Sequence, residues 1–224
     1  MHDLDGDKQA AEVEETEVEE GEAPAERHLF VVTLRPLPAG RELFYTYGEL
    51  SNGELLSRYG FVLPLNPFDK APLEWAAFEW AAELAIGPQA WRHRLRELRN
   101  LADARDLLGQ VHEVDSSGVS PPSLVRLARL VLIPALPADG IPHDLGEVDG
   151  GAINALLLSA VRAQAARCAE SAAVLSARCA GQAAAATLCH SRWERAATLM
   201  DGLVAIWRRA ERLLLAAPRY GINH

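Results

Sequence analysis

The stretch His28–Phe61, HLFVVTLRPLPAGRELFYTYGELSNGELLSRYGF, holds signals for strand, turn, strand, capped helix and helix stop in unbroken succession. Its first part, residues 28–34, is rich in β-branched and aromatic side chains, and two prolines end that run. An Ala-Gly pair then turns the chain into a second run, Glu42–Tyr47. These features predict a pair of short strands, with Tyr45 and Tyr47 on the same face of the second one.

A short helix is predicted directly after the strand pair. Ser51 and Glu54 form the Ser-x-x-Glu pattern of a capping box, in which each side chain satisfies a backbone N–H of the first turn. Gly60 can adopt the left-handed conformation and is therefore expected to end the helix just after Tyr59. The chain would then leave in a new direction at Phe61.

Charge is concentrated at one end of the chain. The formal charge is −9, but residues 1–26 hold eleven acidic residues against one lysine, and the rest carries 20 acidic and 21 basic side chains. The near-neutral body gives no electrostatic case for nucleic acid or a membrane surface. Residues 1–26 also lack apolar periodicity, so we expect a disordered, solvated acidic segment. Attraction of a basic substrate tail is an alternative role for it.

The cysteines favour core packing over a disulfide framework, because Cys168, Cys179 and Cys189 are odd in number and lie in alanine-rich helical sequence. Cys189-His190 has no second ligand pair nearby, so no metal site is expected. No apolar run reaches the length of a membrane span, and the N-terminus lacks the pattern of a signal peptide. We therefore expect a soluble, intracellular protein of the cytoplasm, the nucleus or the chloroplast stroma.

After a proline-punctuated connector, the apolar period becomes helical. Helices are expected over residues 74–86, 89–108, 121–134, from 153 onward with a potential break at Gly181, and 191–216. The expected apolar anchors are Trp75, Phe78 and Ala82; Trp91, Leu95, Leu98, Ala102 and Leu108; Leu124, Leu127, Ala128, Val131 and Leu132; and Leu199, Leu203, Ile206, Ala210 and Leu213.

The second of these helices carries a cluster of basic residues. Arg92, His93, Arg94, Arg96 and Arg99 could suggest an RNA-binding helix face. They alternate with apolar anchors, however, as the residues of any solvated helix face do. We therefore favour the interpretation that this face is simply exposed to water.

The residues AGRELFYTYGELSNGELLSRYGFV closely resemble the C-terminal end of the SET domain in the branch that includes the Rubisco large-subunit lysine methyltransferase. In that branch Gly-x-Glu-Leu-Phe/Ile-x-x-Tyr-Gly is followed by Ser-Asn-x-Glu-Leu-Leu and then by Tyr-Gly-Phe. All three pieces occur here in order. The resemblance implies a protein-lysine N-methyltransferase that uses S-adenosyl-L-methionine (AdoMet) and carries a helical substrate-binding domain behind its SET domain.

The resemblance also implies roles for particular residues. Tyr47 corresponds to the catalytic tyrosine, whose hydroxyl orients the amine that accepts the methyl group. Tyr59, Gly60 and Phe61 correspond to the segment that lines the cofactor and lysine channel. His2 corresponds to the cofactor-contacting histidine of an Asn-His pair. Without the motif, a tyrosine on a strand is more often a packed residue.

The expected fold is α+β and mostly helical overall. A partial SET domain, made of short strands and a capped helix over residues 27–66, precedes an all-α substrate-binding domain over residues 72–217. The partner implied by the resemblance is a protein substrate bound by the helical domain. No nucleic acid, membrane or metal partner is expected.

The start of the chain suggests an incomplete enzyme. His2 lies 45 residues before Tyr47, near the spacing of the family's Asn-His pair, but Met1 stands where the asparagine is expected. The chain then looks like the second half of a SET enzyme, and alone it should bind AdoMet weakly or not at all and transfer no methyl group. The alternative is a non-catalytic protein-binding module, and in-frame sequence upstream of Met1 discriminates the two.

Overall fold

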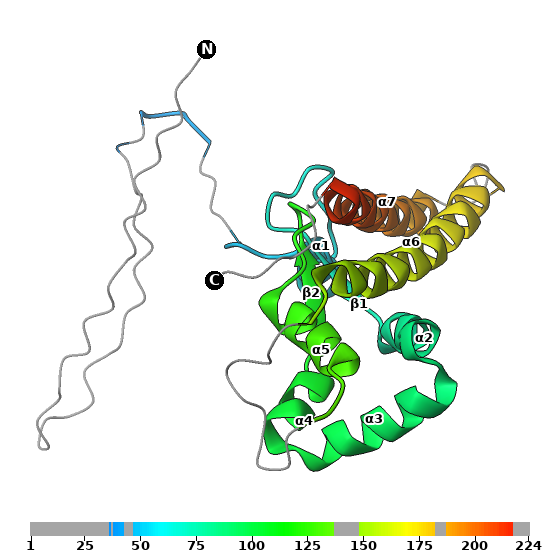
Figure 1. Ribbon diagram of the computed structural model, residues 1–224. Helices are drawn as coiled ribbons and strands as arrows, with labels where there is room; N and C mark the ends of the chain where they lie inside the picture. The colour runs from blue at the N-terminus through cyan, green and yellow to red at the C-terminus, as the bar shows by residue number, and fades with distance from the viewer. Residues whose placement is uncertain (1–35, 37, 43–46, 137–147, 182–186, 217–224) are drawn as a thin grey trace, which may run out of the picture. The chain divides into compact units, whose positions relative to one another are not determined.

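The computed structural model describes residues 36, 38–42, 47–136, 148–181 and 187–216 (Figure 1). The chain divides into two compact units, Met1–Thr46 and Tyr47–His224. The acidic segment and nearly all of the expected strand pair lie outside the described residues. In the part that is described, the fold is α+β and mostly helical, with seven helices and one two-stranded sheet. The domain limits expected from the sequence stay a prediction.

Helix α1, Asn52–Tyr59, has the capping box that the sequence predicts. The Ser51 backbone N–H donates to Glu54 Oε2 at 3.0 Å, and the Glu54 backbone N–H donates to Ser51 Oγ at 3.4 Å. The bond from the Ser51 backbone N–H, together with one that the Ser51 hydroxyl donates to Glu54 Oε2 at 3.0 Å, holds the pKa of Glu54 below its usual value. Gly60 has φ 76° and ends the helix in the left-handed conformation, which confirms the predicted stop.

Substitution Ser51→Ala should lower the free energy of unfolding by about 1 kcal/mol, because it removes the side-chain half of the cap. Ser57→Ala is the matched control in the same helix, since the exposed Ser57 hydroxyl donates only to the carbonyl of Glu54. Urea titration measures both variants. A loss for Ser51→Ala no larger than that of Ser57→Ala would contradict the importance of the capping box.

The sheet was not expected from the sequence. Strands β1, Lys70–Leu73, and β2, His112–Asp115, pair antiparallel, with Ala71 opposite Val114 and both side chains buried. Pro72 argues against a strand when the sequence is read alone, because proline has no backbone N–H to donate to the sheet and is confined to edge strands. In a sheet of two strands every strand is an edge, so the proline is tolerated.

Four helices follow the general order that was predicted: α2 Trp75–Ile86, α3 Pro88–Asn100, α4 Ala102–Gly109 and α5 Pro122–Leu132. The single helix expected over 89–108 is wrong, because Leu101 is extended and separates α3 from α4. The break changes the helical phase, so the expected anchor Ala102 is exposed while Ala104 and Leu107 face the core. No glycine or proline marks this break, and it depends on tertiary packing.

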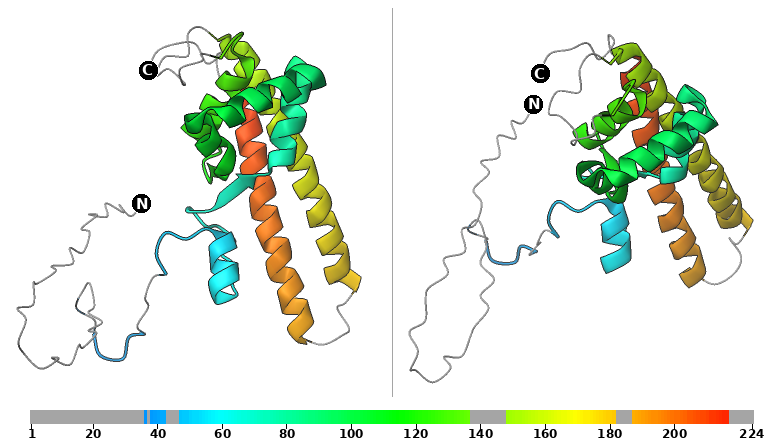
Figure 2. Two further views of the ribbon diagram at one scale, coloured as in Figure 1. Left: turned by 90° about the horizontal axis from the view of Figure 1, so that it is seen from below. Right: turned by 60° about the horizontal axis from the view of Figure 1, so that its bottom comes forward.

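Two long helices complete the described part, α6 Gly150–Gly181 and α7 Thr187–Ala216, and all views show them side by side and antiparallel (Figures 1 and 2). α6 reaches Gly181, the residue at which a break was expected. On α7 the expected anchor Leu213 is 44% exposed, and the neighbouring Leu214 is buried instead. The reason is that a straight helix follows a 3.6-residue period, and Trp207, Ala210 and Leu214 keep to it.

The β2–α5 turn packs directly on α7. Gly118 has φ +86°, and a Cβ atom built there would lie 2.7 Å from the Ala210 backbone nitrogen. Only glycine permits both this conformation and this approach. Cys168 is buried in the core beneath α7, as expected, and Cys179 is partly exposed. None of the described helices is both long enough and apolar enough to span a bilayer.

His112 is a buried histidine on β2 with both ring nitrogens bonded. Nε2 lies 3.0 Å from the Leu107 carbonyl oxygen, which can only accept, so Nε2 carries the proton and Nδ1 accepts from Ser123 Oγ at 3.0 Å. Burial lowers the pKa of His112, and the bond to Leu107 opposes this in part. The folded state therefore holds His112 neutral.

Stability should fall as pH drops below about 6.5, the ordinary pKa of histidine, because the unfolded chain then binds a proton that folded His112 refuses. The decline continues until the lowered pKa of the folded state is reached. Urea unfolding at several pH values between 7 and 5 should show this slope in the wild type, and His112→Gln should reduce it. His93→Gln, at an exposed position, is the control that should keep it. Equal slopes in all three proteins would contradict the prediction.

Candidate functional site

Three aromatic rings named by the sequence motif lie together at one end of α1. The ring centroids of Tyr47 and Tyr59 are 4.4 Å apart, those of Tyr47 and Phe61 are 5.3 Å apart, and those of Tyr59 and Phe61 are 6.4 Å apart. All three pairs are tilted, an arrangement in which aromatic rings attract each other. We call this group the ring cluster.

Helix α1 brings the two parts of the ring cluster together. Tyr47 precedes the helix, whereas Tyr59 is its last residue. The left-handed Gly60 then reverses the direction of the chain, so Phe61 can approach Tyr47 rather than continue along the helix axis. A helix of eight residues is about 12 Å long. For the Tyr47 ring to reach Tyr59 and Phe61, the segment before the helix must therefore run alongside α1 toward its C-terminal end.

The ring cluster is open to solvent on one side. Tyr47 is 38% exposed and Tyr59 is 48% exposed, while Phe61 is partly buried. Large aromatic side chains with this much exposed area are candidates for a binding surface, because their burial against a ligand removes apolar area from water. The cluster thus presents two hydroxyl groups and accessible ring faces.

A buried polar network fixes the chain on both sides of the ring cluster, and Asn52 is its centre. The Asn52 side chain accepts from the Leu63 N–H and donates to the Leu63 carbonyl, both at 2.9 Å. This pair of bonds fastens the segment that follows Phe61 to the first turn of α1. Asn52 is only 2% exposed, so water cannot replace these bonds without opening the structure.

Asp69 supplies the negative charge of this network. Its Oδ1 accepts from the Asn52 backbone N–H at 2.9 Å and its Oδ2 accepts from the Asn52 side chain at 3.0 Å. A carboxylate at the first turn of a helix interacts favourably with the unpaired N–H groups there. Gly202 of α7 backs the carboxylate, since a Cβ atom at that glycine would lie 3.1 Å from Asp69 Oδ2.

Asn66 closes the network on the other side. Its side chain donates to the Leu50 carbonyl at 2.8 Å, three residues after Tyr47, and accepts from the Phe68 N–H at 3.0 Å. The network therefore holds Leu50, three residues after Tyr47, and Leu63, two residues after Phe61. Asn52, Asn66 and Asp69 were missed as site-supporting residues by the sequence reasoning. The asparagine of the Ser-Asn-x-Glu piece was the one available signal.

Two further site residues were expected, Gly60 and His2. Gly60 lies between two of the rings and has the backbone conformation that was expected. His2 lies outside the described residues, so its expected cofactor contact stays a prediction. Within the described part of the chain, no group of three or more His, Cys, Asp or Glu side chains is placed to hold a metal ion.

Over part of its length the chain is similar to SET-domain N-lysine methyltransferases. Human N-lysine methyltransferase SETD6 is 32% identical over 84 residues, which cover 37% of this chain and 18% of the human protein. The bovine protein of the same name is 31% identical over 84 residues, 37% of this chain and 19% of its own length. The chain thus spans about a fifth of the length of these curated relatives. No protein-family model matches the chain.

Proposed function

We propose that this chain is the C-terminal part of an AdoMet-dependent protein-lysine N-methyltransferase of the Rubisco large-subunit methyltransferase branch. The ring cluster is the observation that carries the proposal. Tyr47 was nominated by the first piece of the SET motif, and Tyr59 and Phe61 were nominated by the last one. The ring centroids of the three residues lie within 6.4 Å of one another. The partial similarity to N-lysine methyltransferases supports the same chemistry.

The aromatic faces of the ring cluster suit two parts of AdoMet. The cofactor carries a sulfonium cation and a flat adenine, and both bind favourably to the faces of aromatic rings. Tyr59 and Phe61, joined by Gly60, would hold the cofactor, and His2 would contribute by the resemblance. AdoMet supplies a methyl group on a positively charged sulfur, from which an uncharged amine can take it directly.

Tyr47 would act on the substrate amine. A lysine has an ordinary pKa of about 10.4 and must lose its proton before its nitrogen can accept a methyl group. A tyrosine hydroxyl that bonds this nitrogen holds its lone pair in line for the displacement, and such positioning supplies much of the rate enhancement in reactions of this kind.

The helical part from β1 to α7 would bind the protein substrate. Its core is continuous from α2 to α7, so it offers a rigid support on which an exposed face can recognise a partner. The Asn52 network holds the segment behind the ring cluster to Asp69, whose carboxylate lies against Gly202 of α7. A substrate bound to the helical part would thereby be held at a fixed position relative to the rings.

The test is methyl transfer by the native polypeptide that contains these 224 residues. It is incubated with AdoMet labelled in the methyl group and with a protein extract, and the labelled products are analysed for methylated lysine. Label on lysine supports the proposal. Capture of a protein partner without label supports the alternative, a non-catalytic module derived from such an enzyme.

A further inference from the structure

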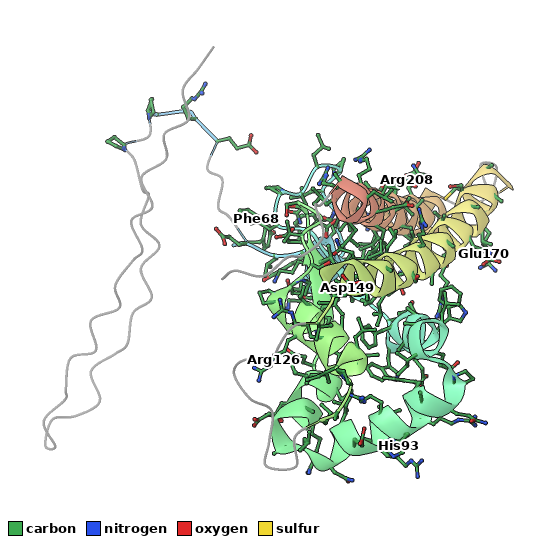
Figure 3. The ribbon with its side chains drawn as sticks, in the orientation of Figure 1. Phe68, His93, Arg126, Asp149, Glu170 and Arg208 are labelled. Atoms are coloured by element: carbon green, nitrogen blue, oxygen red, sulfur yellow. The ribbon has the colours of Figure 1, made fainter. Side chains whose placement is uncertain are left out.

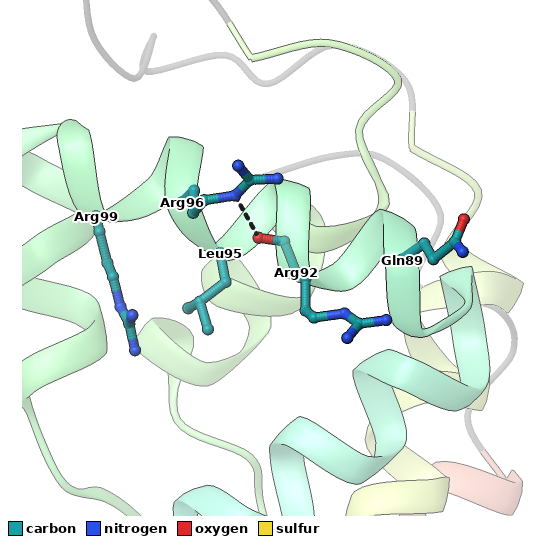
Figure 4. Close-up of a pocket in the computed structure, with 5 residues that line it drawn as sticks. All are labelled: Gln89, Arg92, Leu95, Arg96 and Arg99. Atoms are coloured by element: carbon teal, nitrogen blue, oxygen red, sulfur yellow. Dashed lines mark hydrogen bonds between the residues drawn. The ribbon is translucent and has the colours of Figure 1, made fainter.

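Helix α3 carries a row of arginines on one exposed face. Arg92, Arg96 and Arg99 follow Gln89 at steps of three, four and three residues, a spacing that places all four side chains along one stripe. Together with Leu95 they line a shallow hollow of about 440 Å³ (Figure 4). We call this feature the arginine groove.

Within the described part of the chain, the arginines of the groove have no acidic partners. Elsewhere in the helical part, Arg94 pairs with Glu97 at 3.3 Å and Arg162 pairs with Glu211 at 2.8 Å. No acidic side chain among the described residues lies within 4.0 Å of the groove's three guanidinium groups. Glu97, the acidic residue of α3 itself, is engaged by Arg94 and His93. Three positive charges are therefore gathered on one face with no ion-pair partner among the described residues, in a body that is otherwise near neutral.

Two of the guanidinium groups are already oriented along the helix. Arg92 Nε donates to the Pro88 carbonyl at 3.1 Å, and Arg96 Nε donates to the Arg92 carbonyl at 3.3 Å (Figure 4). Each bond uses one of five N–H donors and leaves the terminal amino groups for a ligand. Because these side chains are already restrained, they lose less conformational entropy when a ligand binds.

The lining of the groove favours carboxylates over nucleic acid. Sequence-tolerant binding of single strands relies on aromatic side chains that stack on bases, and the groove has none. Leu95 instead gives it an apolar floor, on which aliphatic parts of a peptide can rest. Planar guanidinium forks match carboxylates in pairs of parallel hydrogen bonds.

We propose that the arginine groove binds a carboxylate-rich segment of a protein partner. Arg92 and Arg96 are about 6 Å apart along the helix axis. Alternate side chains of an extended peptide are separated by about 6.6 Å, so glutamates at every second position can meet successive arginines. None of the ring-cluster residues takes part, and the binding does not depend on methyl transfer.

The test uses the full chain and a fluorescent peptide of alternating glutamate and alanine, with a glutamine-alanine peptide as the uncharged probe. The groove variant is Arg92→Gln with Arg96→Gln. The matched control is Arg208→Gln with Arg212→Gln, two exposed arginines with the same spacing on α7 (Figure 3 labels Arg208). The titrations are repeated with the seven glutamates of residues 12–22 changed to glutamine, so that the chain's own acidic residues cannot compete.

We expect the glutamate peptide to bind at low salt, the glutamine peptide not to bind, and the groove variant to weaken binding by about tenfold. The control variant should change binding less than twofold. Absence of binding in both backgrounds would overturn the proposal, and so would equal losses in the two variants. Tighter binding of a short single-stranded RNA than of the glutamate peptide would also overturn it.

Discussion

Tyr47→Phe should lower the methyl-transfer turnover of the native polypeptide by at least about tenfold while the fold is retained. The substitution removes only the hydroxyl, and the ring keeps its contacts with Tyr59 and Phe61 at 4.4 and 5.3 Å. Loss of one hydrogen bond that orients the reacting atom typically costs this much or more. Turnover at saturating AdoMet and protein substrate measures the effect, and circular dichroism checks the fold.

Tyr59→Phe is the matched control, because it deletes the same group from the neighbouring ring. Under the proposed roles Tyr59 lines the site but does not orient the amine, so its loss should lower turnover less than about threefold. Unchanged turnover in Tyr47→Phe would remove Tyr47 from the mechanism. Equal losses in the two variants would mean that the hydroxyl of Tyr47 has no special role.

Asn52→Ala should destabilise the protein by about 3 kcal/mol. The substitution leaves the N–H and carbonyl of Leu63 without their partner and removes a donor from the Asp69 carboxylate. A polar group that loses its partner inside a protein costs about 1–3 kcal/mol, and the groups of Leu63, a residue that is 43% exposed, contribute at the low end. Because the network holds the segment behind Phe61, tryptophan fluorescence during urea unfolding should report a lower midpoint for the whole described unit.

Asn100→Ala is the control for this prediction, since Asn100 is exposed at the end of α3. Its effect should stay within about 0.5 kcal/mol, as for most surface substitutions. If Asn52→Ala has an equally small effect, the network contributes nothing to stability. That result would also remove the reason to connect the network with the position of the rings.

Features that depend on neighbouring residues were predicted well from the sequence. The capping box of Ser51 and Glu54 needs only residues three apart, and the stop at Gly60 needs only the conformational freedom of glycine. The helix period likewise located α2, α5, α6 and α7 to within a few residues. Each of these signals is contained in a short window of the chain.

Features that depend on distant residues were not predicted. Asn52 and Asp69 are 17 residues apart, and nothing in either segment indicates that they meet. The break at Leu101 and the pairing of β1 with β2 arise from packing between segments. The exposed Leu213 and buried Leu214 show that even a regular helix can be misread by one residue when its neighbour is unknown.

The candidate site was predicted in part. The resemblance nominated Tyr47, Tyr59 and Phe61, and the structure brings their rings into contact, but the roles given to them stay predictions. The basic residues of α3 were interpreted as a solvated face. Among the described residues Arg94 has an acidic partner while the three arginines of the groove have none, and this difference becomes visible only when the surroundings of each side chain are known.

Calorimetric titration with AdoMet tests most directly the claim that this chain supplies one wall of a methyl-transfer site. Tyr59, Gly60 and Phe61, with His2 by resemblance, would provide part of the cofactor contacts, and each 1.4 kcal/mol of missing contact energy weakens binding about tenfold. We expect micromolar binding by a native polypeptide that includes the remaining SET segments, and binding at least about a hundredfold weaker by the 224-residue chain alone. Micromolar binding by the 224-residue chain would contradict it.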